Sequence, residues 1–278
     1  MAEFSIREVT NMTEIRGIVE VQRQAWQMAD LEVVATFEMK AVASFGTVLI
    51  AVDNTDKVIG FIYAFPYFPD MHYSHMMATL PEWQGRGVGF AMKKRHREIA
   101  LKSEVKINKI VWTVDPLLTN NSYLNFSKLG GVCSTYYPDY YGDAGEVGIY
   151  NGIETDRFLL EWPINDERVE RRMQDYHIDR INITTLLKRS PVLNSIHDDR
   201  FVEKNIEGNI GRFSVEVPAN YQKLKDASLE IAKEWRLKFR EICQSHFKSG
   251  WEIIDFHSFI IKGERRNYYE FTLKTNHG

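Results

Sequence analysis

Residues 81–90 of the chain read PEWQGRGVGF and place Gly85, Gly87 and Gly89 within five positions. The residues before this stretch read as a β-strand, and those after it have helical periodicity. A glycine-rich turn between a strand and a helix exposes backbone N–H groups, and the helix start adds a partial positive charge. Glycine also lets the backbone approach a ligand closely. The stretch therefore predicts an anion site suited to a pyrophosphate.

The spacing of these glycines separates three kinds of nucleotide-binding loop. A P-loop ends in Gly-Lys followed by Ser or Thr, whereas this loop ends in Gly89, Phe90 and Ala91. A dinucleotide-binding loop has the spacing G-x-G-x-x-G after the first strand of its unit, whereas several antiparallel-looking strands precede this one. The remaining pattern is Gln/Arg-x-x-Gly-x-Gly/Ala, which Gln84, Gly87 and Gly89 match. An ordinary glycine-rich turn is the alternative.

The elements around the loop follow a regular order. Asn11 and Glu14 have the spacing of a capping box at a helix start. Upstream of the loop the patterns predict a strand over 4–9, helices over 11–26 and 33–44, and strands over 47–52, 57–67 and 71–80. Downstream they predict a helix from 90, a strand over 107–114, a helix over 121–129, and strands over 132–137 and 158–162.

The composition changes after Pro163, and a second, smaller unit is predicted there. Residues 165–176 are densely charged and read as a linker or a surface helix. The patterns then predict strands over 178–187 and 212–217, one long helix over 218–248, and a final hairpin over 251–261 and 268–273. We therefore expect two domains, 1–164 and 165–278.

The loop pattern and the order of elements over residues 4–162 resemble the GNAT superfamily of acyl-CoA-dependent N-acyltransferases. The resemblance implies an α/β (α+β) fold with a mixed, mostly antiparallel central sheet flanked by helices, and a smaller C-terminal α+β domain. That second domain resembles half of such a fold without its own glycine loop, so we expect it to bind no second coenzyme A. The C-terminal segments also resemble a little-characterised two-domain subgroup of the superfamily.

The resemblance assigns cofactor contacts residue by residue. In the family the loop amides hold the pyrophosphate of coenzyme A, and the strand before the loop pairs its backbone with the pantetheine arm. An Asn of the later helix, Asn121 here, also contacts the cofactor. The loop positions are Gln84, Gly85, Arg86, Gly87, Val88, Gly89 and Phe90, and the strand positions are Met77, Ala78 and Thr79.

A general base is the next requirement, because an ammonium group has no lone pair for attack. Period-two alternation predicts Tyr73, His75, Met77 and Thr79 on one face of their strand. In family members with a histidine base, that residue lies nine positions before the first loop residue, which is His75 here. Its unperturbed pKa near 6.5 suits a base at neutral pH. The alternatives are a structural histidine, or Tyr73, His72 or a water relay as base.

The usual acid of the family is a Tyr four residues before the glycine of the second helix. Phe126 occupies that position here, and this is the main departure from the pattern. Tyr123, three residues earlier on the same helical face, is a substitute. A thiolate, with a pKa of about 8–9, can also leave without an acid. The departure leaves a non-catalytic acyl-CoA-binding sensor or scaffold as the alternative function.

The expected reaction moves an acetyl group, or another short acyl group such as succinyl, from coenzyme A to a small amine or amino acid. The resemblance implies direct attack in a ternary complex. Tyr136, Tyr137, Tyr140 and Tyr141 form either an acceptor pocket or a half-buried rim. On the long C-terminal helix, Glu234, Arg236 and Arg240 read as solvated charges or, alternatively, as a clamp for an acceptor carboxylate.

Composition and charge argue against several other classes of protein. The formal net charge of −3 gives no basic footprint for nucleic acid, and the basic run 93–97 reads as a solvated helix face. Cys133 and Cys243 fit no metal-ligand spacing and read as reduced, buried thiols. No signal peptide is recognisable, and no apolar run reaches the roughly 18 residues of a membrane span. We therefore expect a cytoplasmic protein without metal, nucleic-acid or membrane partners. A homodimer built through the C-terminal unit is left open as an alternative to a role of that unit at the acceptor site.

Overall fold

The structure is a computed structural model that describes residues 3–28, 30–67, 69–142, 152–205 and 210–274. The chain divides into two compact units: unit 1 comprises Met1–Trp112 with Pro163–Asp166, and unit 2 comprises Thr113–Trp162 with Glu167–Gly278. These units do not coincide with the division expected after residue 164, which remains a prediction. Of the described helices, none combines the length and the apolar character that crossing a membrane requires.

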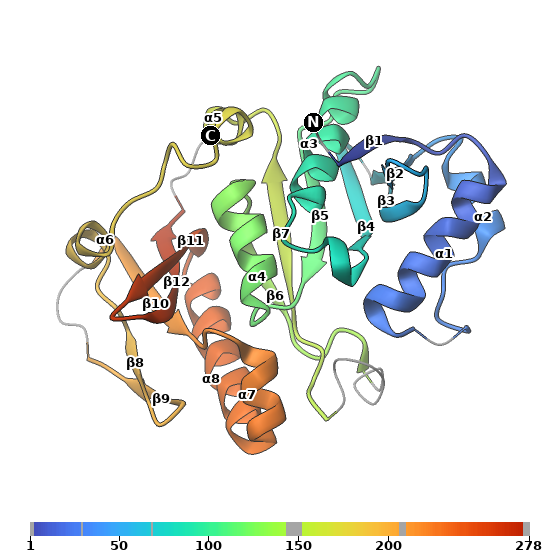
Figure 1. Ribbon diagram of the computed structural model, residues 1–278. Coiled ribbons are helices and arrows are strands. Elements are labelled where there is room, and N and C mark those ends of the chain that lie inside the picture. Colours follow the sequence, from blue (N-terminus) through green and yellow to red (C-terminus); the bar gives the residue numbers. More distant parts are fainter. Residues whose placement is uncertain (1–2, 29, 68, 143–151, 206–209, 275–278) are drawn as a thin grey trace. The chain divides into compact units, whose positions relative to one another are not determined.

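Unit 1 is built on a mixed sheet with the strand order β1-β2-β3-β4-β5 (Figure 1). The first four strands pair antiparallel, and β4 and β5 pair parallel. Helix α1 begins after Asn11, whose side chain caps the backbone N–H of Glu14, as the capping box predicts. The strands are β1 (Phe4–Glu8), β2 (Thr47–Asp53), β3 (Val58–Tyr67), β4 (Met71–Thr79) and β5 (Lys109–Val114), and the helices are α1 (Met12–Trp26), α2 (Thr36–Val42) and α3 (Val88–Leu101).

The helices of unit 1 cover both faces of its sheet. On one face, Trp26 of α1 packs against Phe61 of β3, and Glu38 of α2 accepts a hydrogen bond from Tyr63. On the other face, Met92 of α3 lies over Gly60, where a Cβ would come within 3.3 Å of its methyl group. The core between these layers is apolar and buried, so the central strands of the unit are hydrophobic on both faces.

In unit 2 the strands follow the order β7-β6-β11-β12-β10, and each adjacent pair is antiparallel. Its core is aromatic: Phe126, Phe158, Phe239 and Tyr269 are fully buried and contact one another edge-on or stacked. The strands are β6 (Val132–Tyr137), β7 (Arg157–Pro163), β10 (Arg212–Val217), β11 (Trp251–Ile261) and β12 (Glu264–Leu273). The helices are α4 (Thr119–Ser122), α5 (Glu167–Gln174), α6 (Ile183–Arg189), α7 (Tyr221–Ala227) and α8 (Leu229–Lys248).

The predicted fold class is confirmed: the strand pairings are mostly antiparallel, and helices flank the strands. Two predicted elements of unit 2 were wrong. The strand over 178–187 is instead helix α6, because the side chain of Asn182 caps the backbone N–H of Thr185. The single helix over 218–248 breaks at Ser228, whose extended backbone and hydroxyl cap start α8. For the charged segment 165–176 the structure shows the helix alternative, α5, and one side of this helix is buried at Arg172 and Met173.

One hairpin was not predicted at all. Strands β8 (Asn194–His197) and β9 (Arg200–Glu203) pair antiparallel around a two-residue turn. Both turn residues, Asp198 and Asp199, have positive φ, the geometry of a type I′ turn. Aspartate tolerates this conformation, but the pair is a weaker sequence signal than Asn-Gly or Asp-Gly.

Candidate active site

The glycine loop lies between β4 and the start of α3, as predicted. Gly85 and Gly87 have φ of 76° and 86°, in the left-handed region that glycine adopts without strain. A Cβ at either position would meet nothing within 4 Å, so the backbone conformation, not crowding, requires glycine here. Gly87 precedes the first residue of α3 and supplies no side-chain cap. The helix start therefore presents backbone amides toward an open side of the loop.

The charges around the loop favour an anion. The first turn of α3 contains no acidic residue. Arg86 lies in the loop, where its guanidinium stacks 5.1 Å from the ring centre of Trp83 and pairs with Glu3 at 3.1 Å. Glu82 faces away to Lys57, at 3.7 Å. The helix dipole and Arg86 thus fit a pyrophosphate at this position.

Strand β4 leads into the loop and parts from β5 along the way. The β4–β5 ladder joins Met71, His72 and Tyr73 to Lys109–Val111, and β4 continues to Thr79 beyond it. The amide of Leu80 donates to the carbonyl of Ile59 in β3. Because antiparallel backbone groups alternate in direction, those of Met77 and Thr79 point away from β3, toward the edge that β5 leaves.

The backbone of Ala78 takes the opposite direction. Ala78 lies across from Phe61, and its carbonyl oxygen faces Gly60 of β3. The carbonyl of Thr79 is within hydrogen-bonding distance of Gln84 Nε2, at 3.4 Å. Of the three strand positions assigned by resemblance, Met77 and Thr79 therefore have backbone groups directed for pairing with an extended ligand.

A β-bulge in β4 corrects the expectation that Tyr73, His75, Met77 and Thr79 share one face. The register passes from Tyr63↔Met76 to Phe65↔Tyr73, so β4 carries one extra residue there. A bulge places consecutive residues on one side, and it moves Met77 and Thr79 to the face of α3. Tyr73 and His75 remain together on the face of α1 and α2, with ring centres 5.9 Å apart.

His75 lies among aromatic rings on that face. Tyr63, Phe65 and Tyr73 each have a ring centre 5.9 Å from the imidazole. Partial burial lowers the pKa of His75, and the negative charge of Glu38 opposes this by a smaller amount. The imidazole still has an exposed edge. His75 is therefore neutral and reachable at pH 7, as a general base must be.

A buried group of basic side chains on the opposite face of β4 was not predicted. Lys93 and His96 of α3 are 1% and 0% exposed, so the basic run 93–97 is not wholly a solvated face. Lys93 Nζ donates to Ser74 Oγ at 3.0 Å, and His96 Nε2 lies 3.3 Å from His72 Nδ1. Burial lowers the pKa of both histidines and of Lys93. The buried residues Val88, Met92 and His96 recur at every fourth position of α3, and this spacing is the sequence signal for the buried face.

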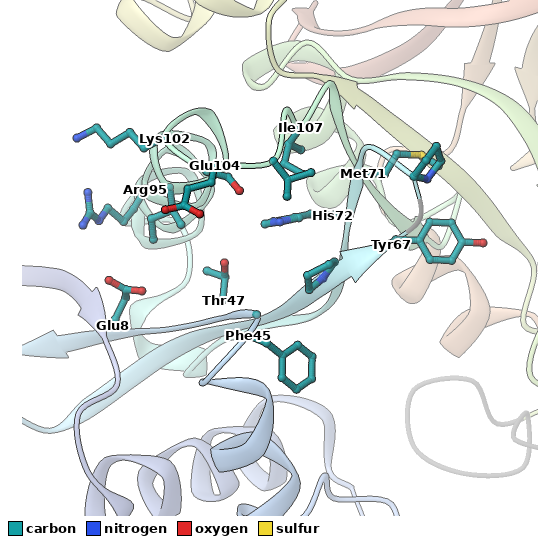
Figure 2. Close-up of a pocket in the computed structure, with 16 residues that line it drawn as sticks. Glu8, Phe45, Thr47, Tyr67, Met71, His72, Arg95, Lys102, Glu104 and Ile107 are labelled. Carbon is teal, nitrogen blue, oxygen red and sulfur yellow. The ribbon is translucent and has the colours of Figure 1, made fainter.

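A cavity of unit 1 lies at the other end of β4 and α3 from the loop. It has a volume of about 820 Å³, and its lining includes His72 and Thr47, both buried (Figure 2). Ile99, in the last turns of α3, lines it as well. Among the residues considered for catalysis it contains only His72, whose Nδ1 faces His96. We therefore treat this cavity as separate from the candidate site around the loop and His75.

Two further predicted residues lie in unit 2. Asn121 is exposed in α4, and Tyr123 begins a π-helical turn, Tyr123–Lys128, where a plain helix was expected. Phe126 is 0% exposed and contacts Phe158 and Tyr269 edge-on. Phe126 thus serves the aromatic core, and this explains an apolar residue at the position where the family has its acid.

The remaining candidate residues of unit 2, the arginines considered for binding an acceptor carboxylate, form ion pairs within the protein. Arg236 is buried and forms a two-pronged ion pair with Asp115, at 2.9 Å for both contacts, so the solvated-charge reading was wrong for this residue. Arg240 pairs with Asp156, which also accepts from Tyr136. A carboxylate clamp by these arginines is therefore already filled by the protein's own carboxylates. Among the described residues, no group of three or more His, Cys, Asp or Glu is arranged to hold a metal ion.

The chain is similar to known proteins over part of its length. Residues 12–130 match the model of the acetyltransferase (GNAT) family. A comparison with curated proteins found no match. Among solved structures, the chain is similar to the ribosomal-protein-S18-alanine N-acetyltransferase from Escherichia coli, with 15% identity, 59% of this chain and 95% of that chain covered, and a TM-score of 0.46.

Two further solved structures are similar to the same extent. A GNAT family acetyltransferase from Elizabethkingia anophelis with acetyl-CoA bound has 22% identity, covers 59% of this chain and 99% of its own, and has a TM-score of 0.45. A phosphinothricin acetyltransferase from Sinorhizobium meliloti in complex with AcCoA has 16% identity, 58% and 88% coverage, and a TM-score of 0.46. Because residues 12–130 match the family model, this part of the chain is a GNAT acetyltransferase domain.

Proposed function

We propose that the protein is an N-acyltransferase that moves an acetyl group, or another short acyl group such as succinyl, from coenzyme A to a small amine or amino acid. The observation that carries the proposal is the junction of β4, loop and α3. There Gly87 leaves the helix start without a side-chain cap, while the β4–β5 ladder ends at Tyr73. The family match over residues 12–130 supports the same reaction class.

Two groups of residues in unit 1 would bind different parts of coenzyme A. The amides of Gly87, Val88 and Gly89 would hold the pyrophosphate, with the charge of Arg86 beside them. The backbone groups of Met77 and Thr79 would pair with the pantetheine arm in the manner of an added strand. These contacts use backbone atoms, so they place the thioester without depending on particular side chains.

His75 would act as the general base. It takes the proton from the acceptor ammonium, whose nitrogen then attacks the thioester carbonyl. The C–N bond forms, the C–S bond breaks and the sulfur leaves as a thiolate, while the attacking nitrogen gives up its second proton to the thiolate or to solvent and so becomes a neutral amide. The neighbouring rings keep His75 neutral by lowering its pKa. Since a thiol has a pKa of about 8–9, the thiolate can leave without a dedicated acid, and a proton-donating role for Tyr123 remains a prediction.

The proposal is tested by calorimetric titration with coenzyme A, acetyl-CoA and succinyl-CoA, beside ATP as a control. We expect micromolar binding of at least one coenzyme A species and its loss in Gly87→Asp, which adds a negative charge to the loop. The tightest acyl-CoA is then used in a screen of amines. Absence of coenzyme A binding by the folded protein would overturn the proposal.

A second candidate function is a non-catalytic acyl-CoA-binding sensor or scaffold. It is favoured by one observation, the fully buried Phe126 at the position of the usual acid. Both functions require coenzyme A binding, so turnover distinguishes them. Release of free thiol with any amine acceptor, measured by a colorimetric thiol assay, establishes the enzyme, whereas binding without release across the amine screen favours the sensor.

A further inference from the structure

A small cavity in unit 2 is lined by none of the residues proposed above for coenzyme A binding or as the base, and it shares only Tyr123, the predicted acid, with the candidate acyl-transfer residues. Its volume is about 220 Å³, and it is lined by the π-helical turn, by the segment that follows α5 and by β11. At about 30 Å³ for each water in the liquid, it has room for a compact ligand and not for a nucleotide. Every lining residue belongs to unit 2.

Most charged groups of this cavity are already paired. Arg172 donates to Asp255 at 2.6 Å and to Asp179 at 3.1 Å. His257 lies 3.0 Å from Glu270, which is buried. These groups hold the walls together, and their charges are neutralised within the protein.

Two cations differ from them: Arg180, an exposed residue that lines the cavity, and Lys128, which is half-buried and is not among the lining residues. The guanidinium of Arg180 lies 5.6 Å from the ring centres of both Tyr123 and Tyr176. Lys128 Nζ lies 5.6 Å and 4.5 Å from the same two centres. In the part of the chain that the structure describes, neither cation has a carboxylate within ion-pair distance. Two like charges thus share one pair of rings.

This arrangement lacks a counter-charge. Cation–π contacts contribute about 0.5–2 kcal/mol each, but they do not neutralise charge, and the two cations repel each other. Partial burial already lowers the pKa of Arg180. Arg180 lines the cavity together with Tyr123 and Ser258, which add hydroxyl groups to its walls. Guanidinium groups bind planar oxyanions through two parallel hydrogen bonds.

We propose that this cavity binds a compact oxyanion, a small carboxylate or a phosphate group, with Arg180 as the two-pronged donor and Lys128 as the second positive charge. A further feature agrees with a ligand site: Tyr123 and Ser127 are presented by a π-helical turn, a conformation that is rare and is found frequently at functional sites. The anion neutralises both cations at once, which no side chain among the described residues does.

The experiment is a calorimetric titration of the full chain with inorganic phosphate and with malonate, in a chloride buffer of constant ionic strength. The variants are Arg180→Gln and Lys128→Gln. The matched control is Arg200→Gln, because Arg200 is an exposed arginine of the same unit that already pairs with Glu230 and Glu234. A melting temperature for each variant confirms that it is folded.

We expect binding of at least one anion below millimolar Kd, weakened tenfold or more in Arg180→Gln and Lys128→Gln and unchanged in Arg200→Gln. Preference for phosphate identifies a phosphoryl group as the ligand, and preference for malonate identifies a carboxylate. Anion binding that persists in folded Arg180→Gln belongs elsewhere, for example at the start of α3, and overturns the proposal. Failure of the wild-type chain to bind either anion overturns it as well. Neither result bears on coenzyme A binding, which is measured separately.

Discussion

Lys93 Nζ lies 3.0 Å from Ser74 Oγ, beneath the point where β4 parts from β5. The amine is also 3.3 Å from the ring centre of Trp112, and the lysine is 1% exposed. Burial lowers its pKa well below the ordinary value. A positive charge on this amine therefore destabilises the folded protein, and Lys93 lowers the free energy of unfolding.

This relationship predicts that Lys93→Met stabilises the protein. Methionine keeps the length of the chain and removes the buried amine, so the free energy of unfolding at pH 7 should rise by about 1–3 kcal/mol. The folded-state pKa is lowered, so the unfolded state binds the extra proton and wild-type stability rises with pH toward the unfolded pKa near 10.4. The gain from Lys93→Met should therefore shrink between pH 7 and pH 9.5.

Denaturant titration at the two pH values measures this gain, with Lys94→Met as the control because Lys94 is the exposed neighbour on α3. Destabilisation by Lys93→Met at both pH values would show that the bond to Ser74 and the contact with Trp112 outweigh the cost of burying the amine.

The base assignment predicts a pH profile. Because the pKa of His75 is lowered, kcat/KM should be constant near pH 7 and should fall on the acid side with a midpoint below about 6.5, the unperturbed value. His75→Gln should lower kcat by about 10²–10⁴-fold and remove this acid limb. His197→Gln is the matched control, because His197 is exposed at the end of β8. An unchanged acid limb in His75→Gln would assign the base to another group.

Glu38 should tune that midpoint. Its negative charge raises the pKa of His75 against the larger effect of burial. Glu38→Gln removes the charge and keeps the shape, so the acid limb should move to lower pH. Glu20→Gln, on the exposed side of α1, should leave the midpoint in place. Movement of the limb to higher pH would contradict the sign of this interaction.

The loop backbone gives a prediction about conformation. Gly87 has a φ of 86°, so Gly87→Ala should lower the free energy of unfolding by about 1–2 kcal/mol through left-handed strain alone. It should also weaken coenzyme A binding, because the backbone amides shift. Gly211→Ala is the control, since a Cβ there meets nothing within 4 Å and no strained φ is involved. Equal stability of the two variants would mean that the loop adapts without strain.

Local features could be predicted from the sequence, and features set by pairing could not. The glycine loop, the Asn11 cap and the order of strands around them depend on residues close together in the chain. The bulge in β4 depends on which residue of β3 faces which residue of β4. An alternation rule applied to β4 alone therefore assigned Met77 and Thr79 to the wrong face.

The burial of charged side chains could not be predicted from the sequence either. Arg236 and Asp115 are 121 residues apart, and each one alone reads as a surface charge. The same holds for Lys93 and His96, which only the packing of α3 on β4 places inside. The fold could thus be inferred from local patterns, whereas the environment of each titratable group required the tertiary structure.

The pair of Arg236 and Asp115 supports the last prediction. Both side chains are buried, and Arg157 adds a second positive charge 3.7 Å from Asp115. Arg236→Met leaves the buried carboxylate with a more distant partner, so the free energy of unfolding should fall by about 3–5 kcal/mol. Arg200→Met, which breaks exposed ion pairs in the same unit, should cost at most about 1 kcal/mol. Denaturant titration compares the two, and a similar small loss in both would mean that Arg157 compensates for the missing guanidinium.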